Sequence, residues 1–129
     1  MLAPNPYAAD CPTRMALDRV GDKWAVLILL LLADRSLRFN ELRRRIEGIS
    51  QKMLSQTLKS LERDGLIGRE AFATVPVTVE YSITPLGQTL TGAVDALRIW
   101  AETHIDRVLE AQQRYDGRRA MGEPAAVDI

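Results

Sequence analysis

Residues 48–65 read GISQKMLSQTLKSLERDG, and no other stretch says as much about the architecture of this chain. It carries the signals of a single helix, because Ser50 is a favoured N-cap and Gly65 is a favoured residue just past a helix end. At about 100° per residue, one narrow apolar face collects three leucines, Leu54, Leu58 and Leu61. The opposite side is polar and contains Lys52, Gln56, Lys59 and Arg63, flanked by Gln51 and Ser55. A solvated surface helix is usually richer in Glu–Lys pairs, so this polar side needs an explanation.

A short arginine-rich helix precedes this stretch. Asn40 is its expected N-cap, and Leu42 and Ile46 form an apolar i, i+4 pair. Its other sides carry three consecutive arginines, Arg43, Arg44 and Arg45. Successive residues on a helix differ by about 100°, so these three cannot all face one partner, and we favour Arg43 and Arg44 as the contacting pair.

The charge of the chain is balanced in total but uneven along its length. Its 129 residues suit a single domain, and its 17 basic residues equal its 17 acidic ones in number. The segment from Arg35 to Arg69, however, holds nine basic residues against four acidic ones, which fits a polyanionic partner. The sequence contains no GxSxG, HExxH or Walker motif, so we expect neither an enzyme nor a cofactor.

Two more helices are expected upstream. The first begins at Cys11-Pro12, since proline suits the first helical position, and the second is the apolar run from Trp24 to Ala33, capped by Asp22. A bilayer takes about 20 residues to cross, so this run is expected to form the buried centre of a domain. The N-terminus has no apolar signal core, and the chain is expected to be cytoplasmic, with no membrane partner.

A β-hairpin and a long helix are expected downstream. The strands cover 66–73 and 77–84, and the second alternates cleanly between apolar and polar residues. Thr84-Pro85 then reads as the cap and first position of a final helix. Along that helix runs an apolar seam at spacings of three and four, formed by Leu86, Leu90, Ala93, Leu97, Trp100, His104 and Val108. The seam is longer than a small core needs, which indicates dimerisation.

This order of elements predicts a mainly α class with a small β-hairpin wing, a winged helix-turn-helix domain with N- and C-terminal dimerisation helices. We expect an N-terminal arm at 1–10, the domain at 11–114 and a loose C-terminal tail at 115–129. The helix quoted first would then enter the major groove of DNA, where Lys52, Ser55 and Gln56 read or approach bases. Phosphate contacts would come from Arg43, Arg44 and Lys59. The alternative for that helix is an ordinary solvated face.

Six segments, in order and at consistent spacing, make the sequence similar to a known family. They are Cys11-Pro12, Gly21–Trp24, Arg38–Leu42, Gly48–Ser55, Leu61–Leu66 and Val79–Gly87. The chain resembles the HxlR-type winged-helix transcriptional regulators, relatives of the MarR-like regulators, over roughly residues 11–104.

The resemblance implies a homodimer that binds a palindromic operator in double-stranded DNA, commonly as a repressor. It implies that Ser50, Lys52 and Ser55 lie on the recognition helix, and the candidate DNA-binding set is Arg43, Arg44, Ser50, Gln51, Lys52, Ser55, Gln56 and Lys59. One departure is at Thr78, where relatives often carry arginine, so the wing is expected to contribute little. A winged-helix protein–protein adaptor without DNA binding is the alternative function.

Cys11 is the single cysteine, so no disulfide can form within the chain and a reducing compartment is indicated. In several members of the resembled family the N-terminal cysteine is a sensing thiol. A position at a helix N-terminus and the nearby Arg14 would both favour a thiolate, which an electrophile or oxidant could modify. The alternative is a small side chain that merely packs.

The candidate dimer interface consists of Leu90, Leu97, Trp100 and His104. His104 is expected to be an interface or core residue rather than a pH sensor, and no metal site is expected from one His and one Cys. A small-molecule effector between subunits, lined by Trp24, Trp100, Leu90 and Leu97, is a secondary expectation.

Overall fold

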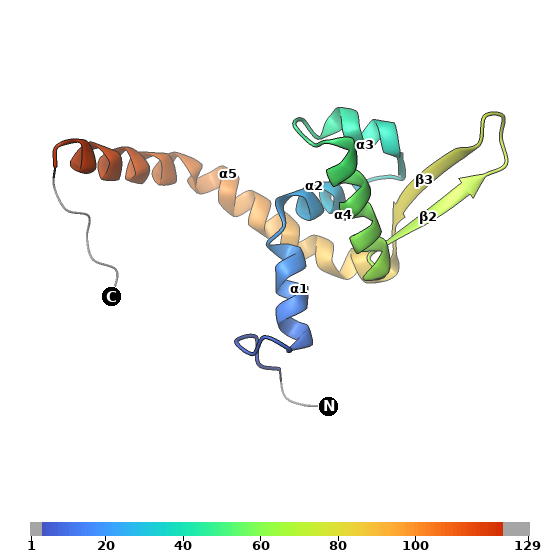
Figure 1. Ribbon diagram of the computed structural model, residues 1–129, viewed down its shortest axis with the longest axis horizontal. Coiled ribbons are helices and arrows are strands. Elements are labelled where there is room, and N and C mark those ends of the chain that lie inside the picture. The colour runs from blue at the N-terminus through green and yellow to red at the C-terminus, as the bar shows by residue number, and fades with distance from the viewer. Residues whose placement is uncertain (1–3, 123–129) are drawn as a thin grey trace. The chain divides into compact units, whose positions relative to one another are not determined.

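The computed structural model describes residues 4–122 and shows a winged helix-turn-helix (Figure 1). In chain order the elements are α1 (Pro12–Val20), α2 (Lys23–Leu32), β1 (Leu37–Arg38), α3 (Phe39–Arg45), α4 (Gln51–Arg63), β2 (Ile67–Phe72), β3 (Thr78–Ile83) and α5 (Pro85–Ala120). The predicted fold class is confirmed. The described chain divides into two compact units between Asp95 and Ala96, so the second unit holds the C-terminal part of α5.

Most helices begin where their capping residues predict. Cys11 occupies the N-cap of α1 and Pro12 follows it. The Asp22 carboxylate accepts hydrogen bonds from the backbone N–H groups of Trp24 and Ala25 at 2.9 and 3.3 Å. Ser50 Oγ accepts from the backbone N–H of Met53 at 3.0 Å. Each of these acceptors satisfies a donor that the first helical turn leaves without a partner.

The start of α3 differs from the prediction. Arg38 rather than Asn40 is the N-cap, and Asn40 lies inside the first turn. The reason is Glu41, whose carboxylate accepts a hydrogen bond from the backbone N–H of Arg38 at 3.1 Å. A glutamate at the third helical position can thus set a helix start even where the cap residue is not itself a favoured one.

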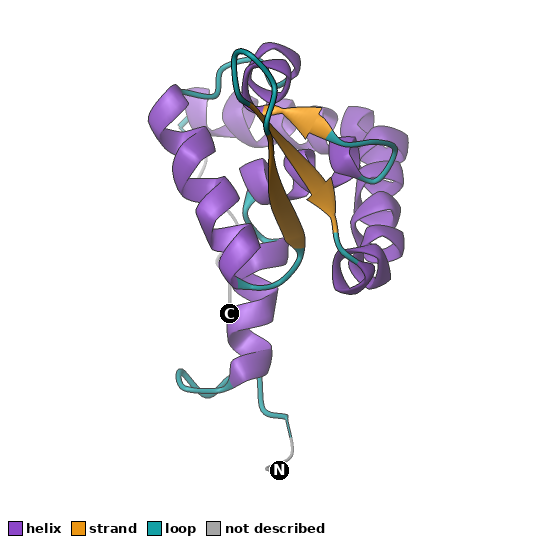
Figure 2. Ribbon diagram, turned by 90° about the vertical axis from the view of Figure 1, so that its right-hand side faces the viewer, coloured by secondary structure: helices purple, strands orange, loops and turns teal. Residues whose placement is uncertain are grey.

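The wing is a three-stranded antiparallel sheet in the order β1-β3-β2 (Figure 2). The predicted hairpin is present, with Ile67 opposite Ile83 and Phe72 opposite Thr78. The short strand β1 adds to its other edge, pairing Leu37 with Tyr81. Toward the hairpin turn the sheet leaves the core, and Val77 is 68% exposed.

The core lies between α2, α3, α4 and the base of the sheet. Its fully buried side chains include Ala25, Ile28, Leu29, Leu32, Leu37, Leu42, Leu54, Leu58, Leu61 and Ile67. The leucine face of α4 is therefore buried, as its spacing predicts. The apolar run of α2 is not buried on all sides, because Leu27 is 40% exposed. One side of α2 has no cover within the described chain.

The helix α5 begins against the end of α4. Thr84 Oγ1 accepts from the backbone N–H of Gly87 at 3.0 Å and donates to the carbonyl oxygen of Gly65 at 2.6 Å. The helix continues to Ala120, whereas the sequence predicted a loose tail from position 115. Good helix formers at 107–114 carry the helix on, and a single Gly117 costs only about 1 kcal/mol. Positions 123–129 of the expected tail lie outside the described residues. None of the described helices is long and apolar enough to cross a membrane.

Candidate nucleic-acid interface

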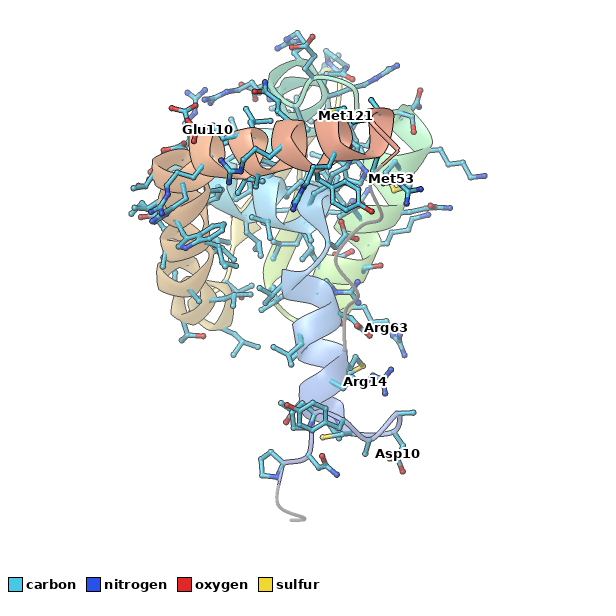
Figure 3. All side chains as sticks on the ribbon, turned by 90° about the vertical axis from the view of Figure 1, so that its left-hand side faces the viewer. Asp10, Arg14, Met53, Arg63, Glu110 and Met121 are labelled. Atoms are coloured by element: carbon cyan, nitrogen blue, oxygen red, sulfur yellow. The ribbon has the colours of Figure 1, made fainter. Side chains whose placement is uncertain are left out.

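The helix α4 presents its polar side to solvent. Gln51, Lys52, Gln56 and Lys59 are exposed, and Ser55 is half-buried. Figure 3 labels Met53 and Arg63 near the two ends of this helix. No acidic residue occurs from Ser50 to Lys59, so the polar groups of this part of the surface are amides, hydroxyls and ammonium groups, with no carboxylate. Ser50 Oγ already accepts from the backbone of Met53, which leaves its O–H as a donor.

A groove of about 570 Å³ separates α4 from the wing. Its lining consists of Phe39, Gln51, Ser55, Leu58, Lys59, Glu62, Arg69 and Tyr81. The groove brings three predicted contact residues, Gln51, Ser55 and Lys59, together with Arg69, which is not among the predicted contact residues. Arg69 lies on β2 directly opposite Tyr81 of β3. Its charge belongs to the basic segment 35–69, but its place beside α4 is visible only in the structure, through the groove that it shares with that helix.

The three arginines of α3 are all exposed, so burial does not separate Arg43 and Arg44 from Arg45. Position does distinguish Arg44. It lines a second groove, of about 800 Å³, whose other wall is formed by Val77 and the first three residues of β3. Arg44 therefore lies on the side of α3 that faces the wing.

The tip of the wing is uncharged. Residues 73–79 contain no lysine or arginine. Thr78 Oγ1 lies 3.2 Å from Thr74 Oγ1, and Thr74 Oγ1 donates to the carbonyl oxygen of Pro76 at 2.8 Å. These threonine hydroxyls thus bond within the tip. The cationic groups of the wing are at its base, where Arg69 lies.

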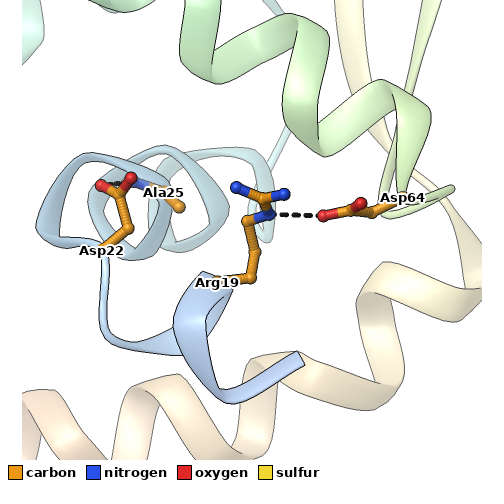
Figure 4. Close-up of polar contacts among 4 residues, drawn as sticks. All are labelled: Arg19, Asp22, Ala25 and Asp64. Carbon is orange, nitrogen blue, oxygen red and sulfur yellow. Dashed lines mark hydrogen bonds and ion pairs between the residues drawn. The ribbon is translucent and has the colours of Figure 1, made fainter. Parts of the chain in front are cut away.

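The acidic end of α4 is split between two surfaces. Glu62 lines the groove beside the wing, whereas Asp64 forms an ion pair with Arg19 at the end of α1 (Figure 4). The two side chains of the pair are 25% and 22% exposed. Asp64 is therefore partly neutralised, and it faces α1 rather than the groove.

Cys11 is partly buried at the N-terminus of α1. The backbone N–H of Asn5 donates to its Sγ at 3.4 Å. This hydrogen bond is the largest cause of a lowered pKa of the Cys11 thiol; burial works against it, and the N–H groups of Thr13 and Arg14 act with it. The Arg14 guanidinium donates instead to the carbonyl oxygen of Tyr7 at 3.4 Å. The thiolate is thus favoured by backbone amides, not by the Arg14 charge.

The candidate dimer residues fall in both units. Leu90 lies in the first unit, half-buried against the core. In the second unit Leu97 and Trp100 are 49% and 57% exposed, and the Trp100 ring stacks on His104 with centroids 5.1 Å apart. The described part of this unit also exposes five large hydrophobic residues outside the predicted set, namely Ile99, Ile105, Leu109, Tyr115 and Met121.

Among residues 4–122, no three His, Cys, Asp or Glu side chains cluster in a way that could hold a metal ion. What the first unit does present is a helix of suitable polarity beside a groove with a cationic wall. Such a surface can place hydrogen-bond donors and positive charge against a DNA groove and its phosphates.

Comparisons with known proteins agree with this arrangement. Residues 19–109 match the family model described as HxlR-like helix-turn-helix. The chain is 47% identical to the HTH-type transcriptional regulator YtfH of Escherichia coli strain K12 over 105 residues, which is 81% of this chain and 83% of that protein.

Two solved structures are also similar. A protein described as a transcriptional regulator, YtfH from Salmonella typhimurium, matches with a TM-score of 0.79 and 43% identity, covering 86% of this chain and 99% of that one. The redox regulator HypR in its oxidised form matches with a TM-score of 0.68 and 41% identity, covering 72% and 96%.

Proposed function

The chain belongs to the HxlR-like helix-turn-helix family, and from that premise we propose that it is a dimeric repressor of a palindromic operator that responds to thiol chemistry at Cys11. That it is an HTH-type transcriptional regulator, not an enzyme, follows from the family itself. The proposal adds which residues contact DNA, how two copies assemble and what changes their binding.

The observation that carries the proposal is the exposed side of α4, which is free of acidic groups from Ser50 to Lys59. We assign base contacts to Lys52, Ser55 and Gln56, because amide, hydroxyl and ammonium groups match base edges in the major groove. Phosphate contacts are assigned to Arg43, Arg44 and Lys59. Ser50 and Gln51, at the start of α4, complete the proposed DNA-binding set. Arg69 joins this set because it lines the same groove.

Two copies would assemble through α1 and α5. The exposed apolar surface of Leu97 and Trp100 supports this, since monomers rarely leave large apolar side chains adjacent on one helix. A two-fold dimer would present two copies of α4 to half-sites about one turn of DNA apart.

The response would act through the Cys11 thiolate. HypR is a redox regulator, and the lowered pKa of Cys11 supports a similar role in this chain. With diamide as oxidant, two Cys11 thiols from two subunits would lose two protons and two electrons to form a disulfide, and diamide would become the hydrazine. The bond would move the two α1 helices and thereby change the half-site spacing.

The test uses a duplex selected from random DNA with the reduced protein. Wild-type affinity should fall with salt at a log–log slope of about −0.9 for each phosphate contact. Arg44→Ala should weaken all sequences alike and reduce the slope by about 1, whereas Lys52→Ala or Gln56→Ala should relax specificity by about 1–3 kcal/mol. Arg107→Ala, an exposed position in the second unit, is the control.

The outcomes separate the competing functions. Absence of any selected, salt-dependent binding would favour a winged-helix adaptor for protein partners. If Arg44→Ala relaxed specificity and Lys52→Ala weakened all sequences alike, α3 would contact the bases and α4 the phosphates. Diamide that leaves DNA affinity unchanged and produces no Cys11-dependent dimer band on a non-reducing gel would remove the thiol response.

A further inference from the structure

A third hollow lies on the first unit, and it shares no lining residue with the two grooves beside the wing. Its volume is about 490 Å³, within the range of small-molecule sites. It is formed by α1, the end of α4, the residue after it and the start of α5. Its lining includes Ala16, Arg19, Arg63, Asp64, Leu66 and Leu86.

The lining has an apolar body and a cationic rim. The apolar side chains come from α1, from Leu66 and from the start of α5, and Leu86 is 55% exposed. Two guanidiniums face one carboxylate, so the rim carries a net positive charge. Arg19 is held by Asp64, whereas Arg63 has no ion-pair partner in the part of the chain that the structure describes.

We propose that this cavity binds a small organic anion with an apolar body, whose carboxylate is held by Arg63. An arginine fork binds a carboxylate through two parallel hydrogen bonds, and the apolar lining removes the rest of the ligand from water. This cavity would be the site of a non-covalent effector of the regulator proposed above. A regulatory effect of the ligand therefore rests on that proposed function.

The location gives such a ligand a route to DNA binding. It would touch the last turn of α4 and both helices assigned to dimerisation, α1 and α5. It would also lie beside the Arg19–Asp64 pair, which joins α1 to the end of α4. A ligand shifts a conformational equilibrium only by its differential affinity for the two states, and this cavity changes shape whenever α1 moves relative to α4.

A second copy of the chain is a less suitable occupant. An apolar helix packed over the cavity would bury the Arg63 guanidinium without a partner, which is costly. An anionic ligand would bring its own partner for that charge.

Calorimetry with the full chain tests the proposal. The probes are cyclohexanecarboxylate, its neutral amide, and acetate, which lacks the apolar body. Wild type should bind only the first, and Arg63→Gln should weaken that binding about tenfold or more, as expected for a lost charged hydrogen-bond pair. Arg35→Gln, an exposed arginine outside the cavity, is the matched control and should bind as wild type does.

A second variant tests the location independently of the charge. Ala16 is exposed on α1 and lines the cavity, so Ala16→Phe should fill it and abolish binding while circular dichroism stays unchanged. Equal binding by wild type, Arg63→Gln and Ala16→Phe would overturn the site, as would no binding of cyclohexanecarboxylate by wild type. Dissociation of a dimer by Ala16→Phe without any probe binding would assign the cavity to a second copy instead.

A DNA readout separates this inference from the proposed function. Cyclohexanecarboxylate should change the operator affinity of wild type about fivefold or more but not that of Arg63→Gln. Failure to bind any DNA would refute the regulator proposal, whereas the calorimetric results would still decide the cavity. Probe binding that leaves operator affinity unchanged would overturn the regulatory half of the inference.

Discussion

Among the glycines, Gly87 is the one whose backbone has the least space around it for a side chain. It is buried in the first turn of α5, and a Cβ at this position would overlap the carbonyl oxygen of Leu66 and lie 2.6 Å from Ile83 Cγ1. Gly87→Ala should therefore destabilise the protein by about 1–3 kcal/mol, because the backbone at Leu66 or at position 87 must move to make room for the methyl group. Denaturant unfolding of the two proteins measures the difference.

Gly92 provides the control in the same helix. A Cβ there meets nothing within 4 Å, so Gly92→Ala should stabilise the chain by about 1 kcal/mol through helix propensity alone. Equal effects of the two substitutions would mean that α5 does not pack against Leu66 as described.

The thiol of Cys11 gives a pH prediction at the same scale. Because the folded pKa is lowered, the thiolate persists to lower pH than in the unfolded chain, so the rise of alkylation rate with pH should have a lower midpoint in the native protein than in denaturant. Iodoacetamide kinetics measure both midpoints.

The cause of the shift can be tested separately. Asn5→Pro removes the backbone N–H that bonds to Sγ and should raise the midpoint, whereas Asn5→Ala keeps that N–H and should leave it unchanged. A midpoint that moves with Arg14→Gln but not with Asn5→Pro would restore the arginine as the cause.

Residue types predict local features of this chain well. Ser50 and Asp22 are good caps wherever a helix can follow, so their roles are visible in the sequence. Asn40 is an equally favoured cap by residue type, but it does not cap α3 because the Glu41 carboxylate accepts the hydrogen bond of the Arg38 amide and the helix starts earlier. Arg69 could not be placed, because its partners in the groove are distant in sequence and depend on strand register.

At the scale of elements, the Arg19–Asp64 pair is the side-chain link between α1 and the end of α4. Both side chains are about a quarter exposed, so solvent screening limits the strength of the pair. A double-mutant cycle with Arg19→Gln and Asp64→Asn should give a coupling energy of about 0.5–1 kcal/mol, smaller in high salt.

The pair Arg98 and Glu102, one turn apart on α5, offers a reference cycle. Their contact of 2.7 Å is more exposed, and its coupling should be about 0.3–0.5 kcal/mol. A coupling for Arg19 and Asp64 no larger than this reference would show that α1 is held by apolar contacts alone.

The elements themselves follow from periodicity, but their neighbours do not. The spacing of Leu54, Leu58 and Leu61 gives the buried face of α4, and the alternation of 77–84 gives a strand. The α2 run is apolar on every side, so its sequence cannot indicate that Leu27 lies on an uncovered face. That depends on which helices pack against it.

For the whole molecule, the prediction concerns assembly. If the exposed apolar residues of α5 form the interface, wild type should sediment as a dimer with a melting temperature that rises with concentration. Trp100→Glu should weaken the dimer by about 2 kcal/mol or more, since buried tryptophans are frequent interface hot spots. Gln113→Glu, exposed on the same helix, should leave it unchanged.

Sedimentation equilibrium distinguishes the cases. A wild-type monomer at all concentrations would contradict the dimer, and a dimer unaffected by Trp100→Glu and Leu97→Glu would place its interface on another surface. The apolar spacing along α5 is visible in the sequence because its repeat is local, and its role as an interface stays a prediction. The separation into two units at Asp95 was not, because no change in composition marks it.

The two-residue strand β1 has a consequence for the order in which the protein opens. It lies in the connection between α2 and α3, and it pairs with Tyr81 and Glu80 of β3. We therefore expect the β3 amides that face β1 to exchange with solvent deuterium only when the connection into the arginine-bearing helix is released as well. We therefore expect the helix-turn-helix and the base of the wing to exchange slowly as one foldon, and the amides of Val75 and Val77 at the exposed tip to exchange at nearly the rate of an unfolded peptide.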